Sequence, residues 1–219
     1  MLVPPAARTR TAWGPAGGLN AGAMLPSVPD PDTPLLQALR TRRSIGPRGL
    51  GAPAPTPEAL QAAAELALCA PDHQGLRPFR FVHVGEEARD ALAELFARAA
   101  TEQGRDPEGV DMARARAAAG PGLLAVVARI RDDVPDVPPH EQWLSVGAGV
   151  MNLLNALHLM GYGAKVLGGS LARAPALQAA FCHGGEQIAC WVITGTPLPD
   201  PPAAPPRSAR DLLTDWPPV

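Results

Sequence analysis

The chain has 219 residues, a formal net charge of −2, 46% hydrophobic residues and 18% charged residues. This charge provides no broad basic surface for nucleic acid, and the hydrophobic fraction is too high for a disordered chain. Three cysteines without a paired framework, and an N-terminal segment without an apolar run, predict a reduced cytoplasmic protein with a single domain.

The 27 prolines crowd toward both ends of the chain. Because proline fixes φ and lacks an N–H, these ends are expected to be irregular rather than helical or paired in a sheet. The distribution predicts a disordered extension over residues 1–32, a folded domain over residues 33–196 and a proline-rich C-terminal segment over residues 197–219.

The first half of this domain carries two clear helix-start signals. Thr33-Pro34 and Thr56-Pro57 each combine an N-cap residue with a proline in the first turn, and each predicts a helix. Aromatic and β-branched residues alternate over residues 79–84 and predict a strand. Two further helices and a buried apolar strand are expected over residues 86–101, 108–117 and 123–129.

Residues 144–164 carry no formal charge, and this stretch is long enough to span a membrane. Asn152, Asn155 and His158 recur at every third position within it, whereas a lipid-facing helix would be uniformly apolar. The pattern therefore predicts no membrane contact. It favours a central helix over residues 140–160 that is buried in protein and whose polar stripe has hydrogen-bond partners.

The last part of the domain is predicted as a strand, a helix and a strand, over residues 164–167, 175–181 and 187–194. The whole order contains few strands for its number of helices. This ratio is typical of a layered α+β domain.

Several common catalytic motifs are missing from the sequence. Gly161 and Gly163 begin a dinucleotide fingerprint, but Val166 occupies the position of its third glycine and the segment follows a helix. Neither a P-loop nor a nucleophile elbow occurs. The spacing of Cys182-His183 and Cys190 matches no common zinc site, so Cys190 is interpreted as a core residue and no metal is predicted.

Two segments are left as candidates for chemistry. Arg42-Arg43-Ser44 places two guanidinium groups and a hydroxyl at a helix end, a set suited to holding a phosphate. The same arginines could instead complement the helix C-terminal carbonyls in water. The second segment, APDH at residues 70–73, contains His73, which is either a site residue or an ordinary histidine of the surface or core. The residues alone leave both alternatives open.

Taken together, residues 34–219 resemble the small single-domain branch of the nitroreductase family. The resemblance rests on the order and spacing of several segments rather than on one motif. These are RRS at 42–44, APDH at 70–73, PFRF at 78–81, LLAVVAR at 123–129, the central helix within 141–164, GTP at 195–197 and DLLTDW at 211–216.

The resemblance implies a three-layer α/β/α domain with a mixed, mainly antiparallel sheet. It also implies a homodimer with FMN at each subunit interface, NAD(P)H as co-substrate and a small-molecule electron acceptor such as a nitro compound or quinone. Hydride would pass to flavin N5 and on to the acceptor in a ping-pong cycle, with no catalytic acid or base side chain.

The same resemblance assigns the cofactor-binding residues. Arg42, Arg43 and Ser44 would hold the phosphate and one side of the ring, and His73 would reach across from the partner subunit. The residues expected to line the flavin on the first subunit are Lys165, Val166, Leu167 and Gly168.

This sequence departs from its relatives at two positions. Relatives have arginine where Leu167 and Cys69 stand, so Lys165, the single lysine of the chain, is the candidate replacement for a lost cation. Positive charge on Arg43 and Lys165 would stabilise the reduced flavin. The proline-rich C-terminal segment is expected to pack on the domain or on the dimer partner through Leu212, Leu213 and Trp216.

Three other functions remain open at this point. The protein could bind flavin or another small ligand without catalysis, or it could be an FMN-dependent dehydrogenase on the same fold. It could also be a structural dimer without a cofactor.

Overall fold

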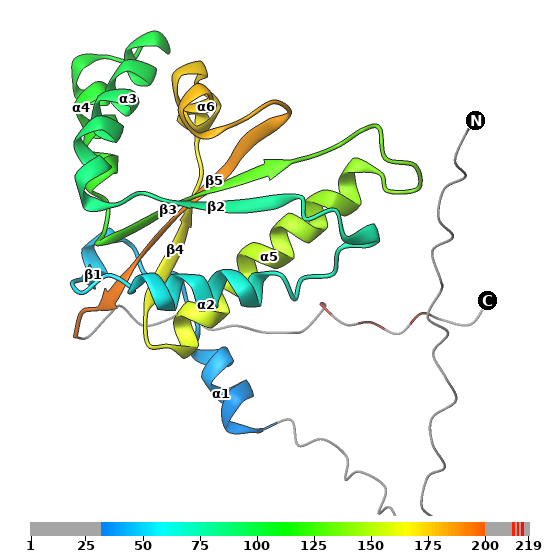
Figure 1. The fold of residues 1–219 in the computed structure, drawn as a ribbon. Helices are drawn as coiled ribbons and strands as arrows, with labels where there is room; N and C mark the ends of the chain where they lie inside the picture. The colour runs from blue at the N-terminus through cyan, green and yellow to red at the C-terminus, as the bar shows by residue number, and fades with distance from the viewer. Residues whose placement is uncertain (1–31, 200–211, 213, 215, 217–219) are drawn as a thin grey trace, which may run out of the picture. The chain divides into compact units, whose positions relative to one another are not determined.

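A computed structural model describes residues 32–199, 212, 214 and 216. In the unit that begins at Pro34, a sheet separates two layers of helices (Figure 1). The strands are β1 Leu50–Gly51, β2 Phe79–His83, β3 Gly122–Arg129, β4 Gly163–Leu167 and β5 Glu186–Pro197. The α-helices are α1 Pro34–Thr41, α2 Pro57–Ala67, α3 Arg89–Glu102, α4 Pro107–Ala115, α5 Pro139–Leu159 and α6 Pro175–Phe181.

The long strand β5 organises the sheet. It pairs with β3 and β4, its last residues pair with β1, and β2 pairs with the far edge of β3. All of these ladders are antiparallel, and an isolated parallel bridge joins Ser44 to Ala164. The predicted mixed, mainly antiparallel sheet is therefore confirmed.

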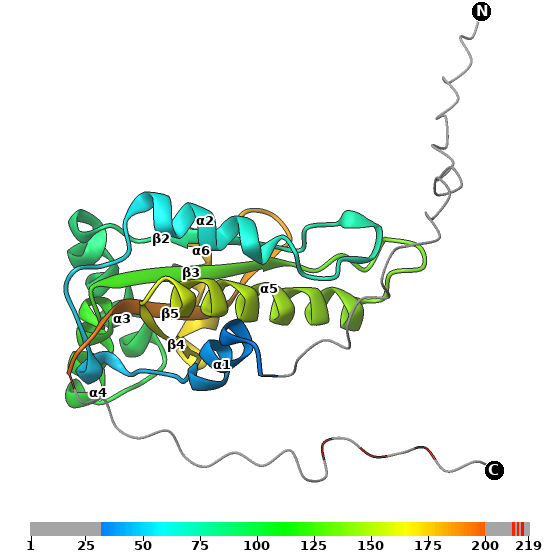
Figure 2. The same ribbon diagram turned by 90° about the horizontal axis from the view of Figure 1, so that it is seen from below.

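Alternating side chains of the sheet supply both cores. Leu123 and Ala125 of β3 face the layer of α3, α4 and α6, whereas Leu124, Val126 and Ala128 face the layer of α2 and α5. Figure 1 shows these two layers on opposite faces of the sheet, and Figure 2 shows α1 beside the C-terminal half of α5. The three-layer architecture is thus confirmed.

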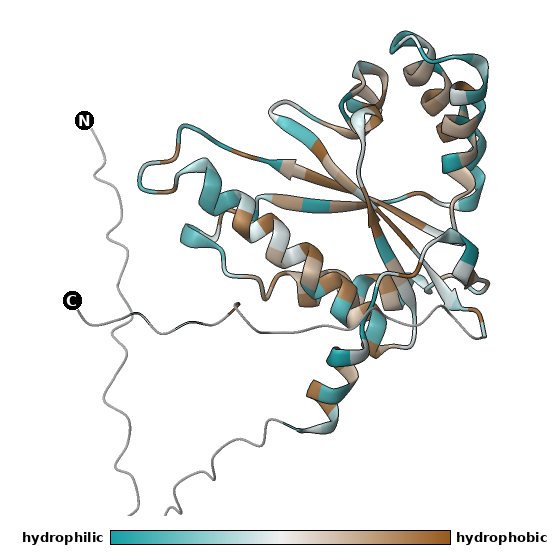
Figure 3. Cartoon of the chain, turned by 180° about the vertical axis from the view of Figure 1, so that it is seen from behind, coloured by the Kyte–Doolittle hydropathy of each residue, from teal (hydrophilic) through white to brown (hydrophobic). Residues whose placement is uncertain are grey.

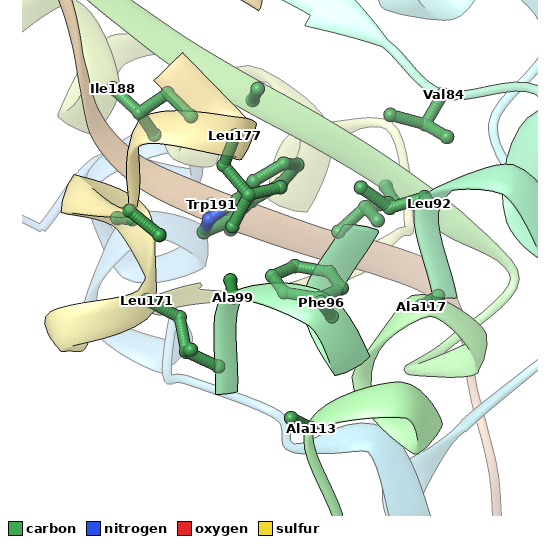
Figure 4. Close-up of a cluster of buried hydrophobic side chains, with 14 of the residues drawn as sticks. Val84, Leu92, Phe96, Ala99, Ala113, Ala117, Leu171, Leu177, Ile188 and Trp191 are labelled. Carbon is green, nitrogen blue, oxygen red and sulfur yellow. The ribbon is translucent and has the colours of Figure 1, made fainter. Parts of the chain in front are cut away.

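A β-bulge shapes the core under α3 and α6. The register between β3 and β5 shifts between Val126 and Val127, so that Ile188 and Trp191 reach the same face although their sequence positions differ by an odd number. Figure 4 shows both side chains in this core with Phe96. The ring centroids of Trp191 and Phe96 are 5.3 Å apart.

The helix-start signals act as the sequence predicts. Thr56 Oγ1 accepts a hydrogen bond from the Ala59 N–H at 3.2 Å, and α2 begins at Pro57. Two features were not predicted. β1 is a strand of two residues, and β5 continues past Thr194 because Thr196 and Pro197 pair with β1.

The central helix α5 is buried on only one face. Apolar residues recur along the helix after its hydrophilic first turn (Figure 3), and Leu153 and Leu157 pack into the core. Leu144, Met151 and Leu159, however, are exposed to 70%, 42% and 45%. Within the single chain, the expected burial of this helix in protein is therefore found on one face only. Among the described helices, none combines the length and hydropathy that a membrane span needs.

An ion pair ties the α6 end of the molecule to the sheet. Arg80 of β2 donates from Nε and Nη2 to the Glu186 carboxylate at 2.9 and 2.6 Å, and Nη2 also donates to the Phe181 carbonyl at 2.6 Å. The Arg80 hydrogen bonds lower the pKa of Glu186 to about 2. Glu186 is therefore ionised at neutral pH.

The predicted C-terminal segment lies mostly outside the described residues, as do residues 1–31 and Leu213. Leu212 and Trp216 are described, and they are exposed to 82% and 81%.

The glycine at position 195 generates a stability prediction. A Cβ at Gly195 would lie 2.8 Å from Pro121 Cδ and 2.9 Å from the Gly51 carbonyl oxygen, and neither atom belongs to a flexible side chain. We expect Gly195→Ala to lower the free energy of unfolding by about 1–3 kcal/mol, as overpacking generally does. Urea unfolding followed by circular dichroism measures this loss.

Gly184→Ala is the matched control, because a Cβ there meets nothing within 4 Å. Its effect should stay within about 0.5 kcal/mol. Equal unfolding midpoints for the two variants would show that the strand junction at Gly195 is not tightly packed.

Candidate functional site

The arginine pair follows α1 directly and is held beside the start of β4. Ser44 forms its bridge with Ala164, and the Ile45 N–H donates to the Ala164 carbonyl at 3.1 Å. The end of α1 is in turn fixed to α5, because His158 Nε2 lies 2.8 Å from the Ala38 carbonyl oxygen and 3.1 Å from Thr41 Oγ1. The sequence prediction that His158 needs a partner is thereby confirmed.

A cavity of about 200 Å³ opens at this junction. The guanidinium-bearing residues Arg42 and Arg43 line one side, and the turn from α5 into β4 lines the other. The remaining lining residues are Thr41, Ile45, Leu154, His158, Gly161, Tyr162, Gly163, Ala164 and Pro197. In the described part of the chain Arg43 has no ion pair, so the cavity presents a cation suited to a phosphate.

Beyond this cavity, one edge of β4 has unpaired backbone groups. In an antiparallel ladder the N–H and C=O of a residue point to the same side, and successive residues alternate. The Ala164 carbonyl points away from β5, since it accepts a hydrogen bond from the Ile45 N–H. The backbone N–H and C=O of Val166, two residues later, therefore point away from β5 as well. No described strand pairs with this edge after Ala164, so Val166 offers a free donor and acceptor.

The loop after β4 leaves its backbone open as well. A Cβ at Gly168 would meet no atom within 4 Å, and Gly169 has φ 137°, a conformation that favours glycine. A flat ligand can thus approach the backbone from Val166 to Gly169 closely.

The predicted residues of β4 divide between its two faces. Lys165 and Leu167 pair with Ile193 and Trp191, which belong to the core under α3 and α6. Val166 pairs with Val192, which belongs to the opposite core. The side chains of Lys165 and Leu167 therefore point to the face opposite that of Val166.

His73 lies at the other end of α5. Its Nδ1 is 2.7 Å from Glu141 Oε2, and Ser145 Oγ donates to the carbonyl of Pro71 in the same loop at 2.7 Å. The 17 residues from Glu141 to His158 span about 25 Å of helix. Within one chain, His73 is thus far from the arginine cavity, and the structure does not bring it together with Arg42, Arg43 and Ser44.

The cysteines offer no second site. Burial raises the pKa of the Cys190 thiol to about 11, and Cys190 packs beside the core of α2 and α5. Within residues 32–199 and the few described positions beyond, no group of three His, Cys, Asp or Glu side chains could hold a metal.

Sequence reasoning missed part of the cavity wall. Leu154, Tyr162 and Pro197 line it, but each comes from a different element and carries no chemical signal of its own. The polar stripe of α5 did single out His158, although as a packing partner rather than as a cavity residue.

The comparisons with known proteins agree with this architecture. The model of the Nitroreductase family matches residues 39–196. A Haemophilus influenzae protein named "Putative NAD(P)H nitroreductase" is 33% identical over 162 residues, which cover 74% of this chain and 87% of that protein.

Two solved structures share the fold. A nitroreductase-like family protein from Bacillus cereus has a TM-score of 0.72 and 19% identity, and the match covers 84% of this chain and 96% of that one. A "putative nitroreductase in complex with fmn" from Desulfovibrio desulfuricans has a TM-score of 0.62 and 23% identity, with coverage of 85% and 98%. From the family match, the relative's identity and the shared fold, it follows that the chain belongs to the nitroreductase family.

Proposed function

We propose that this protein is an FMN-dependent NAD(P)H oxidoreductase that reduces nitro compounds, quinones or similar electrophilic acceptors. The observation that carries the proposal is the junction of two features. A cationic cavity at Arg42 and Arg43 leads directly onto the free backbone edge of β4. The name of the Haemophilus influenzae relative supports the activity, and the FMN complex of the Desulfovibrio desulfuricans protein supports the cofactor.

The residues present fit FMN at both ends. Arg42, Arg43 and the Ser44 hydroxyl match the phosphate, which planar guanidinium groups bind through paired hydrogen bonds. The free N–H and C=O of Val166 and the open backbone at Gly168 match the hydrogen-bonding edge of a flat ring. When bound, FMN would accept hydride from NAD(P)H and deliver it to the acceptor.

The side chains of this chain would act by binding and by charge. Arg43 would place a fixed positive charge near the ring, which favours the reduced anionic state. Leu167 can contribute only its backbone, because its side chain packs against the core under α3 and α6. Lys165 has no ion pair among the residues that the structure describes, so its ammonium group remains the candidate for the missing cation.

His73 enters this site only from a second subunit. It lies about 25 Å along α5 from the arginine cavity of its own chain. The exposed apolar side chains of Leu144, Met151 and Leu159 run along the outer face of the same helix. Such a stripe is typical of a protein interface, so we infer a homodimer that packs α5 against its copy. Leu212 and Trp216, both exposed, would pack on the partner as well.

The colour of the purified protein tests the proposed function. The purified protein should be yellow, the flavin that heat releases should be FMN by chromatography, and anaerobic NADH or NADPH should bleach it. A nitroaromatic or quinone should then restore the colour.

Each other result identifies a competing function. Flavin that neither nicotinamide bleaches contradicts the proposal, and points to a binding protein or to a dehydrogenase with another hydride donor. A colourless protein that does not take up added FMN would indicate a structural dimer.

Removal of one arginine tests the cofactor site. Arg43→Ala should lower FMN affinity by about tenfold to a hundredfold, since a charged hydrogen bond contributes about 1.5–3 kcal/mol. Quenching of flavin fluorescence on titration with the apoprotein measures the dissociation constant. The control is Arg48→Ala, an exposed arginine five residues later that lines none of the cavities described. If both variants bind FMN equally well, Arg43 is not a phosphate ligand.

A charge on the outer face of α5 tests the dimer. Met151→Glu should weaken dimerisation at least tenfold, because burial of an unpaired carboxylate is costly, and sedimentation velocity measures the change. Met112→Glu is the control, since Met112 is a comparably exposed methionine on α4, at 59%. Unchanged dimers in both variants would place the interface elsewhere.

A further inference from the structure

His158 lies in the wall of the arginine cavity, together with Arg42 and Arg43. It comes from the last turn of α5, and its side chain is half-buried. The titratable residues of the described wall, besides His158, are Arg42, Arg43 and Tyr162. The wall therefore contains no carboxylate that could pair with a charged imidazole.

The contacts with α1 fix which ring nitrogen of His158 carries a hydrogen. Nε2 lies 2.8 Å from the Ala38 carbonyl oxygen, which can only accept a hydrogen bond. Thr41 Oγ1 donates its own hydrogen to this carbonyl and lies 3.1 Å from Nε2, so it also accepts from Nε2. Nε2 therefore carries a hydrogen. Nδ1 has no hydrogen-bond partner among the described residues, so it is the nitrogen left for a ligand.

The charge of the ring decides whether Nδ1 can bind a phosphate. In a neutral ring with its hydrogen on Nε2, Nδ1 is an acceptor and would repel the phosphate oxygens. In the imidazolium both nitrogens donate, so His158 can keep its bond to Ala38 and donate from Nδ1 as well. A phosphate dianion beside the ring favours this charge, whereas without an anion Arg42 and Arg43 oppose it.

Lys165, the other candidate for an added cation, is not placed in this wall. It is not among the residues that line the cavity. Its side chain points to the face of the sheet under α3 and α6, whereas α5, which carries His158, covers the opposite face. Of the two residues, His158 is therefore the one that shares a cavity with Arg43.

We propose that His158 is a phosphate ligand of the arginine cavity, and that it binds as an imidazolium after taking up one proton from solvent. The inference rests on the cofactor of the proposed function, because the phosphate is that of FMN. The proton goes to Nδ1, which then donates to a phosphate oxygen, while Nε2 keeps its contact with α1. His158 thereby couples ligand binding to the packing of α1 on α5.

Riboflavin, which differs from FMN only by the missing phosphate, is the matched ligand. His158→Gln keeps an N–H donor near the position of Nε2 but has no second ring nitrogen. This variant should lose about tenfold or more of the FMN affinity and none of the riboflavin affinity, since one charged hydrogen bond is lost. Flavin fluorescence measures both dissociation constants.

His83→Gln is the control variant. His83 is an exposed histidine at the end of β2 and lines none of the cavities described. It should bind both flavins as the wild type does.

Calorimetry at about pH 7.5 tests the proton directly. The phosphate is already a dianion at this pH, since its second pKa is about 6, so a proton that is taken up goes to the protein. Titration with FMN in two buffers of different ionisation enthalpy should show net proton uptake, and titration with riboflavin should show none. The uptake should disappear in His158→Gln and persist in His73→Gln, which removes the other histidine assigned to this site.

Failure of this inference and failure of the proposed function give different results. Flavin that no nicotinamide bleaches, but that His158→Gln still loses selectively as FMN, contradicts the function and supports the ligand. If the protein takes up no flavin, inorganic phosphate is the probe. It should shift the ring signal of His158 in nuclear magnetic resonance, which is the signal missing in His158→Gln.

Three results would overturn the proposal. One is an equal preference for FMN over riboflavin in the wild type and in His158→Gln. Another is proton uptake that is lost in His73→Gln instead. The third is a His158 ring signal that neither FMN nor inorganic phosphate moves.

Discussion

The hydrogen bond from the Ile45 N–H to the Ala164 carbonyl is the contact on which the candidate site depends. It fixes the segment after α1 against the first residues of β4, and so brings Arg42 and Arg43 to the wall of a cavity instead of leaving them in water. The ladder with β5 sets which backbone groups of β4 point outward, and it directs those of Val166 to the same side as the Ala164 carbonyl. This contact thus lies where the arginine cavity meets the free edge of β4.

Strand β4 lines two different cavities. Its first residues, Gly163 and Ala164, line the arginine cavity. Leu167 and the two glycines that follow line a second cavity of about 140 Å³, whose wall includes Phe96 and Trp191. Neither Gly168 nor Gly169 has a side chain that could cover this second cavity.

The elements that the sequence predicts well are those with a local cause. Thr56 caps α2 by its own hydroxyl, and the alternation in residues 79–84 reflects a strand in which Phe79 and Phe81 face one core and Val82 faces the other. β1 has no such cause, since Leu50 and Gly51 become a strand only by pairing with the end of β5. The bulge in β5 could not be predicted from the sequence either, because it depends on the register between β5 and β3.

The candidate site shows the same division. The sequence alone suggests a phosphate site at Arg42 and Arg43, and the family resemblance relates this pair to residues 165–168. The direction of each β4 side chain, in contrast, follows from the ladder with β5 and could not be predicted. The exposed face of α5 was missed because its apolar residues look like core residues. The second cavity could not be predicted either, since it depends on the volume that Phe96, Trp191 and their neighbours leave unfilled.

The length of α5 has a genetic consequence. If each site takes Arg43 from one subunit and His73 from the other, these two residues belong to different sites within any one chain. A cell that makes two defective chains, one lacking Arg43 and one lacking His73, would then assemble mixed dimers in which one site has lost both residues and the other has lost neither. In that case two inactive alleles would complement each other, because a helix of about 25 Å between these residues would assign the two ends of one subunit to separate sites.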